Sequence, residues 1–367
     1  MQFFDKAHQD YKVTGITGRY IQPKQVDDFY ASCPGSVQIA TLGQSVEGRN
    51  IQMAALGNGK LKILMWSQMH GNESTTTKAV LDAIAFLSSE EPFAAEILKK
   101  CQLRIIGMLN PDGALRYTRE NANGVDLNRD AIEQTQPESV ILRSAYEEFQ
   151  PDFCFNLHDQ RTIYNVGFSE QPATLSFLAP SMDEERTINK SREHSMQLIA
   201  AINDAMQNEI PGNIGRYDDA FNANCIGDTL QMLGTPTLLF EAGHFPGDYE
   251  REIVRKHVFH SLLVAISALS NESYLKNDVQ SYFGIPENNK RYFDILIRNY
   301  SGGKKGDLED IGILFREDLL EEQIHFVPYL QDRGELGAYF GHQTYDFSDQ
   351  KDREYLKNSP LSSLLDI

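Results

Sequence analysis

Short apolar runs alternate with segments of helical periodicity along most of the chain. The apolar runs, which predict strands, lie at residues 37–42, 51–56, 62–67, 103–109, 153–157 and 237–240. The first two flank a turn at 45–49 and predict a hairpin. Segments that predict helices lie at 75–87, 140–149, 193–206 and 250–269. Strands that alternate with helices indicate an α/β fold, with a mixed, mostly parallel sheet covered by helices.

The pattern changes after Ser270-Asn271-Glu272. Residues 287–345 carry clustered aromatic residues, short apolar runs and glycine-containing turns, which predict a small β-rich C-terminal appendage. We therefore expect a catalytic domain at 1–272, whose first 35 residues or so form an extension, and a small β-rich domain at 273–367. The sequence leaves three roles open for this appendage: capping a cleft, dimerisation, or covering the sheet.

Composition sets the class of protein. The 367 residues are 41% hydrophobic and 23% charged, as in an ordinary soluble globule. With 34 basic and 52 acidic residues, the net charge is −18, so nucleic acid and anionic membranes are not expected partners. The N-terminus shows no apolar signal region, and no stretch approaches the roughly 18 apolar residues of a membrane span. Four scattered cysteines without a Cys-x-x-Cys pair agree with a reduced, cytoplasmic chain.

The most informative motif follows the apolar run at 62–67. His70 and Glu73 lie three residues apart in Met69-His70-Gly71-Asn72-Glu73, so one tight turn presents an imidazole and a carboxylate together. Zinc in catalytic sites accepts nitrogen from His and oxygen from Glu, and keeps one position open. The motif alone occurs often by chance, so a third ligand is needed.

His158 offers that third ligand, because it too ends an apolar run, at 153–157. Ligands bind at the carboxyl ends of strands in α/β sheets, so His70 and His158 are expected to meet. A set of two histidines and one glutamate belongs to the ligand sets of hydrolytic zinc sites. The alternative is a hydrogen-bonded core histidine at 158 and a turn histidine at 70.

Three further features agree with a metal site. Asn110-Pro111-Asp112-Gly113 forms a turn after the run at 103–109. The segment 119–129 contains Arg119, Asn128 and Arg129, whose side chains suit a carboxylate ligand. Glu241 ends the apolar run at 237–240, where a base that accepts a proton from water is wanted.

In this order, the motifs resemble the zinc carboxypeptidase family of the carboxypeptidase A type, and its small bacterial branch without a prodomain in particular. The resemblance covers roughly residues 35 to 270. It implies one zinc ion per chain, held by His70, Glu73 and His158, and hydrolysis of the C-terminal amide bond of peptides. It also implies that Glu241 is the general base and that Arg119 polarises the scissile carbonyl. Asn128 and Arg129 would bind the terminal carboxylate, and Asp126 would orient the first zinc histidine.

Two points stay open. Tyr217 takes the place of the family's mobile tyrosine only if a short gap is allowed; otherwise Ala220 stands there and Tyr217 is a packed surface aromatic. The rival activity is that of an N-acyl amino acid deacylase of the aspartoacylase or succinylglutamate desuccinylase type, which shares His-x-x-Glu and Asp-x-Asn-Arg, so the substrate is a peptide or an acylated amino acid. An inactive peptide-binding relative is the other alternative, although such relatives lose a ligand or the base and this chain keeps all of them.

Overall fold

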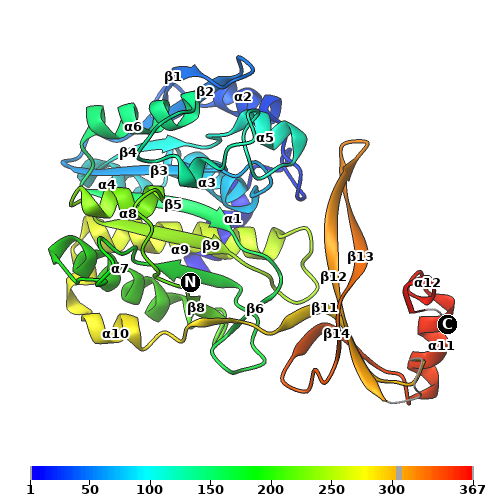
Figure 1. The fold of residues 1–367 in the computed structure, drawn as a ribbon. Helices are drawn as coiled ribbons and strands as arrows, with labels where there is room; N and C mark the ends of the chain where they lie inside the picture. The colour runs from blue at the N-terminus through cyan, green and yellow to red at the C-terminus, as the bar shows by residue number, and fades with distance from the viewer. Residues whose placement is uncertain (1, 303–307, 366–367) are drawn as a thin grey trace.

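An eight-stranded sheet forms the centre of the protein (Figure 1), whose computed structural model describes residues 2–302 and 308–365. Its strand order is β1-β2-β4-β3-β5-β9-β7-β8, with the strands at Gln38–Gln44, Asn50–Leu56, Cys101–Ile106, Leu61–Ser67, Phe153–Asp159, Thr237–Ala242, Leu175–Leu178 and Ile214–Arg216. The four central strands, β4, β3, β5 and β9, are parallel. The pairs β1–β2, β2–β4 and β7–β9 are antiparallel, and β8 pairs parallel with β7. The predicted α/β fold with a mixed, mostly parallel sheet is confirmed.

Helices cover both faces of this sheet, which explains why its central strands are apolar throughout. In β3, Ile63 and Met65 enter the larger core, while Leu64 and Trp66 enter a second core on the other face. The larger core contains α3 (Thr75–Leu87), α4 (Pro92–Lys100), α7 (Lys190–Met206) and α9 (Glu252–Ser270). The second contains α6 (Pro137–Phe149) and α8 (Ile226–Met232).

Helix α9 is long and apolar enough to cross a membrane by length and composition, but 72% of its apolar window is buried inside the protein. The N-terminal segment, with α1 (Gln2–Tyr11) and α2 (Pro23–Ser32), packs on the same layer. Arg255 of α9 forms an ion pair with Asp82 of α3 at 2.6 Å and donates to the carbonyls of Val13 and Ile16. The N-terminal extension is therefore part of the core.

The apolar run at 103–109 predicted a strand that continues to Leu109, which is wrong at its C-terminal end. Strand β4 ends at Ile106 and not at Leu109. The amide of Gly107 instead donates to the Tyr30 hydroxyl at 2.9 Å, and the amides of Leu109 and Asn110 donate to the carbonyls of Ser67 and Gln68. The apolar run therefore continues past the strand as a connection that lies along the turn after β3.

The separate C-terminal sheet begins at Tyr292. Before it, η2 (Ser273–Lys276) and α10 (Val279–Phe283) still pack against α7, and β10 (Asn288–Lys290) pairs with β6 (Tyr164–Val166). The second sheet has the order β13-β12-β11-β14. Its strands and the two helices that follow are β11 (Tyr292–Tyr300), β12 (Glu309–Leu320), β13 (Gln323–Gly334), β14 (Phe340–Asp346), α11 (Gln350–Asn358) and α12 (Ser362–Leu365).

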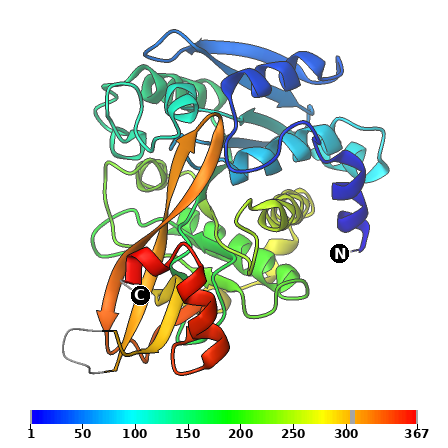
Figure 2. The ribbon, with the colours of Figure 1, turned by 90° about the vertical axis from the view of Figure 1, so that its right-hand side faces the viewer.

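The long hairpin β12–β13 extends from this second sheet across the larger unit (Figure 2). Glu317 of β12 pairs with Arg19 at 3.0 Å, and Tyr329 of β13 accepts a hydrogen bond from Arg161 at 3.4 Å. Phe315 packs on Tyr249, which follows β9, with 5.4 Å between ring centroids. Because Arg161 and Tyr249 follow β5 and β9, the hairpin lies at the carboxyl ends of the parallel strands.

Candidate active site

A tight turn after β3 presents His70 and Glu73. It opens at Gln68, whose φ of 51° is left-handed, and the Gln68 amide side chain donates to the Gly71 carbonyl at 2.8 Å. A Cβ on Gly71 would lie 1.9 Å from the carbonyl carbon of Gly113, so only glycine fits. Gly113 belongs to α5 (Pro111–Arg116), and Asn110, the N-cap of α5, donates to the Met69 carbonyl at 3.1 Å. The Asn-Pro-Asp-Gly turn therefore braces the turn that carries the two side chains.

His70, Glu73 and His158 converge on one point. The Nδ1 atoms of the two histidines face each other at 3.1 Å, and Glu73 places Oε1 2.7 Å from His70 Nδ1 and Oε2 2.8 Å from His158 Nδ1. Their candidate ligand atoms all lie within 4.8 Å of one another. Two imidazole nitrogens and a carboxylate directed at a common centre form a donor set that fits zinc.

Electrostatics keep Glu73 ionised. Burial opposes its negative charge, but the charges and hydrogen bonds of His70 and His158 hold the pKa of its carboxyl well below its usual range. A carboxylate must be deprotonated to bind metal, and Glu73 meets this condition.

Asp126 fixes the orientation of His70. It precedes η1 (Leu127–Arg129) and lies 3.0 Å from His70 Nε2, which leaves Nδ1 for the cluster. The same carboxylate accepts from Arg119 Nε at 3.1 Å and from the Asn128 amide at 2.9 Å. Burial opposes its ionisation, but the hydrogen bond and charge of His70, together with Arg119, lower the pKa of Asp126.

Glu241 lies beside the cluster on β9, where it is the register partner of His158 on β5. Its side chain is buried, and its Oε2 has no hydrogen-bond partner among the described residues. Burial, followed by the nearby charges of Glu73 and Asp159, raises the pKa of Glu241 well above its usual value. A buried carboxylate with a raised pKa and an unsatisfied oxygen is suited to accept a proton.

The cluster opens into a cavity of about 360 Å³. Its lining includes the sequence-predicted residues His70, Glu73, Arg119, Asn128, Arg129, His158, Tyr217 and Glu241. Asp126 is outside this lining and acts on it through His70, Arg119 and Asn128. The structure thus brings together side chains as far apart in the sequence as His70 and Glu241.

Two arginines occupy different positions around this cavity. Arg119 reaches Glu73 at 3.3 Å and Asp126 at 3.1 Å, beside the cluster. Arg129 is exposed, and within the described part of the chain its guanidinium meets only the Asn128 carbonyl at 2.7 Å and Cys225 Sγ at 2.8 Å. No described carboxylate lies within ion-pair distance of Arg129, although its charge acts on Asp228 in the same cavity, so its guanidinium is open to a ligand.

Tyr217 lines the same cavity. Its hydroxyl lies 2.8 Å from that of Tyr164, and burial, with Glu241 next in effect, raises the pKa of Tyr217. Ala220, the alternative that the sequence left open for this position, lines the cavity as well.

Sequence reasoning missed several residues of this region. Asp159, directly after His158, accepts from the amides of Thr75 and Thr76 at 2.8 and 3.2 Å and so ties β5 to the start of α3. Its position beside a ligand was the available signal. Tyr164 and Arg251 carried no signal, because neither belongs to a motif and both reach the site only through the tertiary fold.

A second His–Glu group lies elsewhere. His257 and His260 of α9 place their Nδ1 atoms 3.0 and 2.7 Å from Glu209, and the three also have the spacing of metal ligands. None of them lines the cavity at the first cluster.

Comparison with known proteins agrees with this geometry. Residues 24–173 match the model of the zinc carboxypeptidase family. An uncharacterized protein of Zymomonas mobilis is 29% identical over 130 residues, or 34% of each chain. Human carboxypeptidase D is 23% identical over 192 residues, which are 44% of this chain and 14% of that protein. The alignments thus span 34% and 14% of these relatives' lengths.

Solved structures show the same fold. A metallo-carboxypeptidase from Burkholderia cenocepacia superposes with a TM-score of 0.57 at 16% identity, covering 70% of each chain. Carboxypeptidase A from Helicoverpa armigera gives a TM-score of 0.54 at 16% identity, covering 75% of this chain and 81% of that one. Residues 24–173, which contain the His-Glu-His group that fits zinc, match the zinc carboxypeptidase family, and the chain shares the fold of the solved carboxypeptidases.

Proposed function

We propose that the protein is a zinc-dependent carboxypeptidase that hydrolyses the C-terminal amide bond of peptides. The observation that carries this proposal is a single cavity lined both by the His70–Glu73–His158 cluster and by the guanidinium of Arg129, which forms no ion pair with a described residue. A substrate with its terminal carboxylate at Arg129 presents the adjacent amide to the cluster, and the match to the family supports the same reading.

One zinc ion per chain is held by His70, Glu73 and His158, with Asp126 orienting His70. When bound, zinc supplies Lewis acidity towards a water molecule and towards the scissile carbonyl.

Glu241 transfers the proton from the attacking water to the leaving amine. Its free Oε2 accepts a proton from the attacking water as the new carbon–oxygen bond forms. The proton then passes to the amide nitrogen as the carbon–nitrogen bond breaks, so that an acid and a free amino acid leave. General acid–base work of this kind typically contributes about 10²–10⁴-fold to the rate.

The remaining residues position the substrate and stabilise charge. Arg119 lies beside the cluster and faces the negative charge that develops on the carbonyl oxygen, an effect worth about 3 kcal/mol for one well-placed donor. Asn128 and Arg129 hold the terminal carboxylate, and Tyr217 closes the cavity near Glu241.

The test is substrate profiling. Purified protein is offered a library of N-acetylated peptides with free C-termini and, in parallel, N-acyl amino acids, each with and without a metal chelator. We expect chelator-sensitive release of single C-terminal residues from peptides. Turnover of N-acyl amino acids alone would replace this proposal with the deacylase activity.

A further inference from the structure

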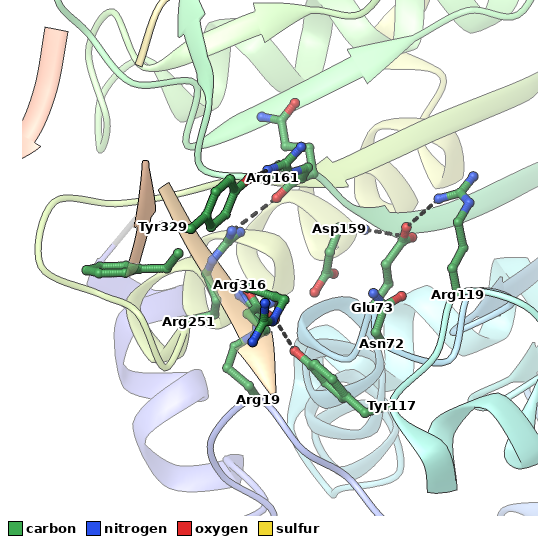
Figure 3. A pocket seen from close by; sticks show the side chains of 13 residues that line it. Arg19, Asn72, Glu73, Tyr117, Arg119, Asp159, Arg161, Arg251, Arg316 and Tyr329 are labelled. Atoms are coloured by element: carbon green, nitrogen blue, oxygen red, sulfur yellow. Dashed lines mark hydrogen bonds and ion pairs between the residues drawn. The ribbon is translucent and has the colours of Figure 1, made fainter. Parts of the chain in front are cut away.

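A second cavity, of about 520 Å³, adjoins the first at the metal cluster (Figure 3). The two share Glu73, Arg119, Asp159, Gln160 and Arg161. The far wall of the second cavity comes from Phe315, Arg316, Glu317 and Tyr329 of the hairpin β12–β13, and Arg19 of the N-terminal segment completes it. The appendage therefore supplies part of a compartment that begins at the metal cluster and leads away from Arg129.

Arginines dominate the charged lining of this compartment, although the whole chain carries −18. The lining includes Arg19, Arg119, Arg161, Arg251 and Arg316, together with the acids Glu73, Asp159 and Glu317. Arg19 pairs with Glu317, Arg119 with Glu73 and Asp126, and Arg316 with Asp318. Arg161 and Arg251 have no ion pair among the described residues, and two such guanidinium groups in one cavity point to an anionic ligand.

Arg251 is the most unusual of these side chains. It is 1% exposed, and its guanidinium donates only to the carbonyls of Ala242 and Gln160, at 2.9 and 3.0 Å. Its Nε has no hydrogen-bond partner, and no carboxylate in the described part of the chain lies within ion-pair distance of it. Burial, with the charge of Arg19 next in effect, lowers the pKa of Arg251 to about 10. The charges of Asp159, Glu317 and Asp248 offset part of the cost of burying this cation without contacting it, and an anion bound directly to the guanidinium would offset more.

Arg161 is also without a counter-ion. It is exposed at the junction of the two cavities, and its one hydrogen bond in the described structure goes to the Tyr329 hydroxyl at 3.4 Å. Arg19 is buried and pairs with Glu317, but its Nε has no partner there either. Three guanidinium groups thus retain donors for a ligand.

The carboxylates of the cavity are already engaged. Asp159 accepts from the amides of Thr75 and Thr76, and Glu317 accepts from Arg19 and from the Tyr117 hydroxyl. Glu73 belongs to the metal cluster. A basic side chain entering the cavity would therefore meet unpaired guanidinium groups and no free acid.

We propose that this second cavity binds the acyl side of the substrate and selects acyl residues that carry a carboxylate, with Arg251 and Arg161 as the groups that recognise it. The inference rests on the proposed carboxypeptidase activity. A peptide with its C-terminal carboxylate at Arg129 and its scissile carbonyl between Arg119 and the metal cluster directs its preceding residues into this cavity. The guanidinium fork matches a carboxylate in two parallel hydrogen bonds, and an amide of the same shape carries no charge for it to bind.

The kinetic test compares acetyl-Glu-Glu-Xaa with acetyl-Gln-Gln-Xaa and acetyl-Lys-Lys-Xaa, where Xaa is the C-terminal residue that the substrate profile favours. We expect kcat/KM to be about tenfold or more higher for the Glu peptide than for the Gln peptide, and lowest for the Lys peptide. Arg161→Gln and Arg251→Gln should each reduce the Glu-to-Gln ratio towards one. Arg143→Gln, on exposed α6 and paired with Glu147, removes one positive charge outside both cavities and should leave the ratio unchanged.

A binding test removes turnover from the comparison. In the Glu241→Gln background, calorimetry with the same peptides should show the same order of Kd values, because this substitution leaves the second cavity intact. Arg251 also donates hydrogen bonds to two backbone carbonyls, so circular dichroism and zinc content check that Arg251→Gln is folded. If Arg251→Gln is unfolded, Arg161→Gln alone provides the test.

The outcomes separate the two proposals. If the parent releases C-terminal residues but treats Glu and Gln peptides alike in rate and Kd, the acyl-side inference is overturned and the carboxypeptidase proposal stands. A Glu preference that survives in both arginine variants also overturns it. If the parent hydrolyses no peptide, the proposed function fails, and this inference fails with it.

Discussion

His158 and Glu241 are register partners on the adjacent parallel strands β5 and β9, so a proposed metal ligand and the proposed base stand side by side on one face of the sheet. The pairing fixes their separation through the backbone ladder and not through a flexible loop. Both side chains are buried, and both face the cavity that Arg129 also lines. The sheet itself therefore holds the base at the metal.

Replacing the base tests its role apart from metal binding. Glu241→Gln should keep the zinc and the fold, because Glu241 is not among the three clustered ligands. It should lower kcat by about 10²–10⁴-fold, since an amide cannot accept the proton of the attacking water. Steady-state kinetics alongside metal analysis check this, and full activity in the variant would show that the base is assigned to the wrong residue.

The metal cluster gives a second prediction. The parent should bind one zinc per chain, and the double variant Glu73→Gln/His158→Ala should bind none at that site, because it removes two of the three ligand side chains. Asp126→Ala should weaken zinc affinity by about 10–100-fold, since His70 loses the partner that orients it. Competition with a chromophoric chelator measures these affinities.

His257→Gln, in the second His–Glu group, is the matched control and should leave the zinc content unchanged. Zinc that persists in the double variant but is lost in His257→Gln would move the metal site to α9.

Much of this site was predictable from sequence because its ligands follow continuous apolar strands. The runs before His70 and Glu241 are apolar since both faces of the sheet are covered, and the carboxyl ends of parallel strands place their final residues together. Strands β5 and β9 each continue one residue past the site residue, to Asp159 and Ala242, whereas His70 follows the end of β3 at Ser67.

The second cavity was not predictable in the same way. Arg19 and Glu317 are 298 positions apart, and the sequence pattern of β12 and β13 gives no direction for their hairpin. Of the three roles left open for the appendage, capping the cleft is the one that these contacts favour. Arg251 follows no motif, and its burial depends on the loop after β9 closing over Gln160.

Docking of the hairpin should depend on Glu317. Removing this carboxylate leaves the buried Arg19 without its counter-ion and the Tyr117 hydroxyl without its acceptor. Glu317→Ala should therefore lower the free energy of unfolding by about 1–3 kcal/mol and speed amide hydrogen exchange in β12.

Glu147→Gln breaks an exposed helix pair with Arg143 and should change the free energy of unfolding by less than about 0.5 kcal/mol. Equal, small effects of both substitutions would mean that the Arg19–Glu317 contact does not hold the hairpin.

A pair of neutral histidines predicts a pH effect on stability. His342 of β14 stacks on Tyr292 and lies 4.2 Å, ring to ring, from His244. Burial, opposed by the hydrogen bond to the Thr162 carbonyl and reinforced by the charge of Arg251, lowers the pKa of His342 from 6.5 to about 4. The unfolded chain therefore binds more protons between these two values, and stability should fall as pH drops from about 6.5 to about 4.

The loss attributable to His342 should be about 2–3 kcal/mol. His342→Gln keeps a donor for Thr162 and cannot titrate, so denaturant unfolding across this pH range should show a shallower pH dependence than in the parent. An identical pH dependence in parent and variant would mean that His342 titrates normally in the folded protein.

The central claim, that the site grips a free C-terminal carboxylate and cleaves the adjacent amide, is tested most directly by one matched substrate pair. The kcat/KM for a peptide acid and for the same peptide with an amidated C-terminus is measured in the parent and in Arg129→Ala. The account predicts that the parent strongly favours the acid, and that Arg129→Ala loses most of this preference by slowing the acid while barely changing the amide, because it removes a charge-assisted grip. Equal cleavage of acid and amide by the parent would contradict it.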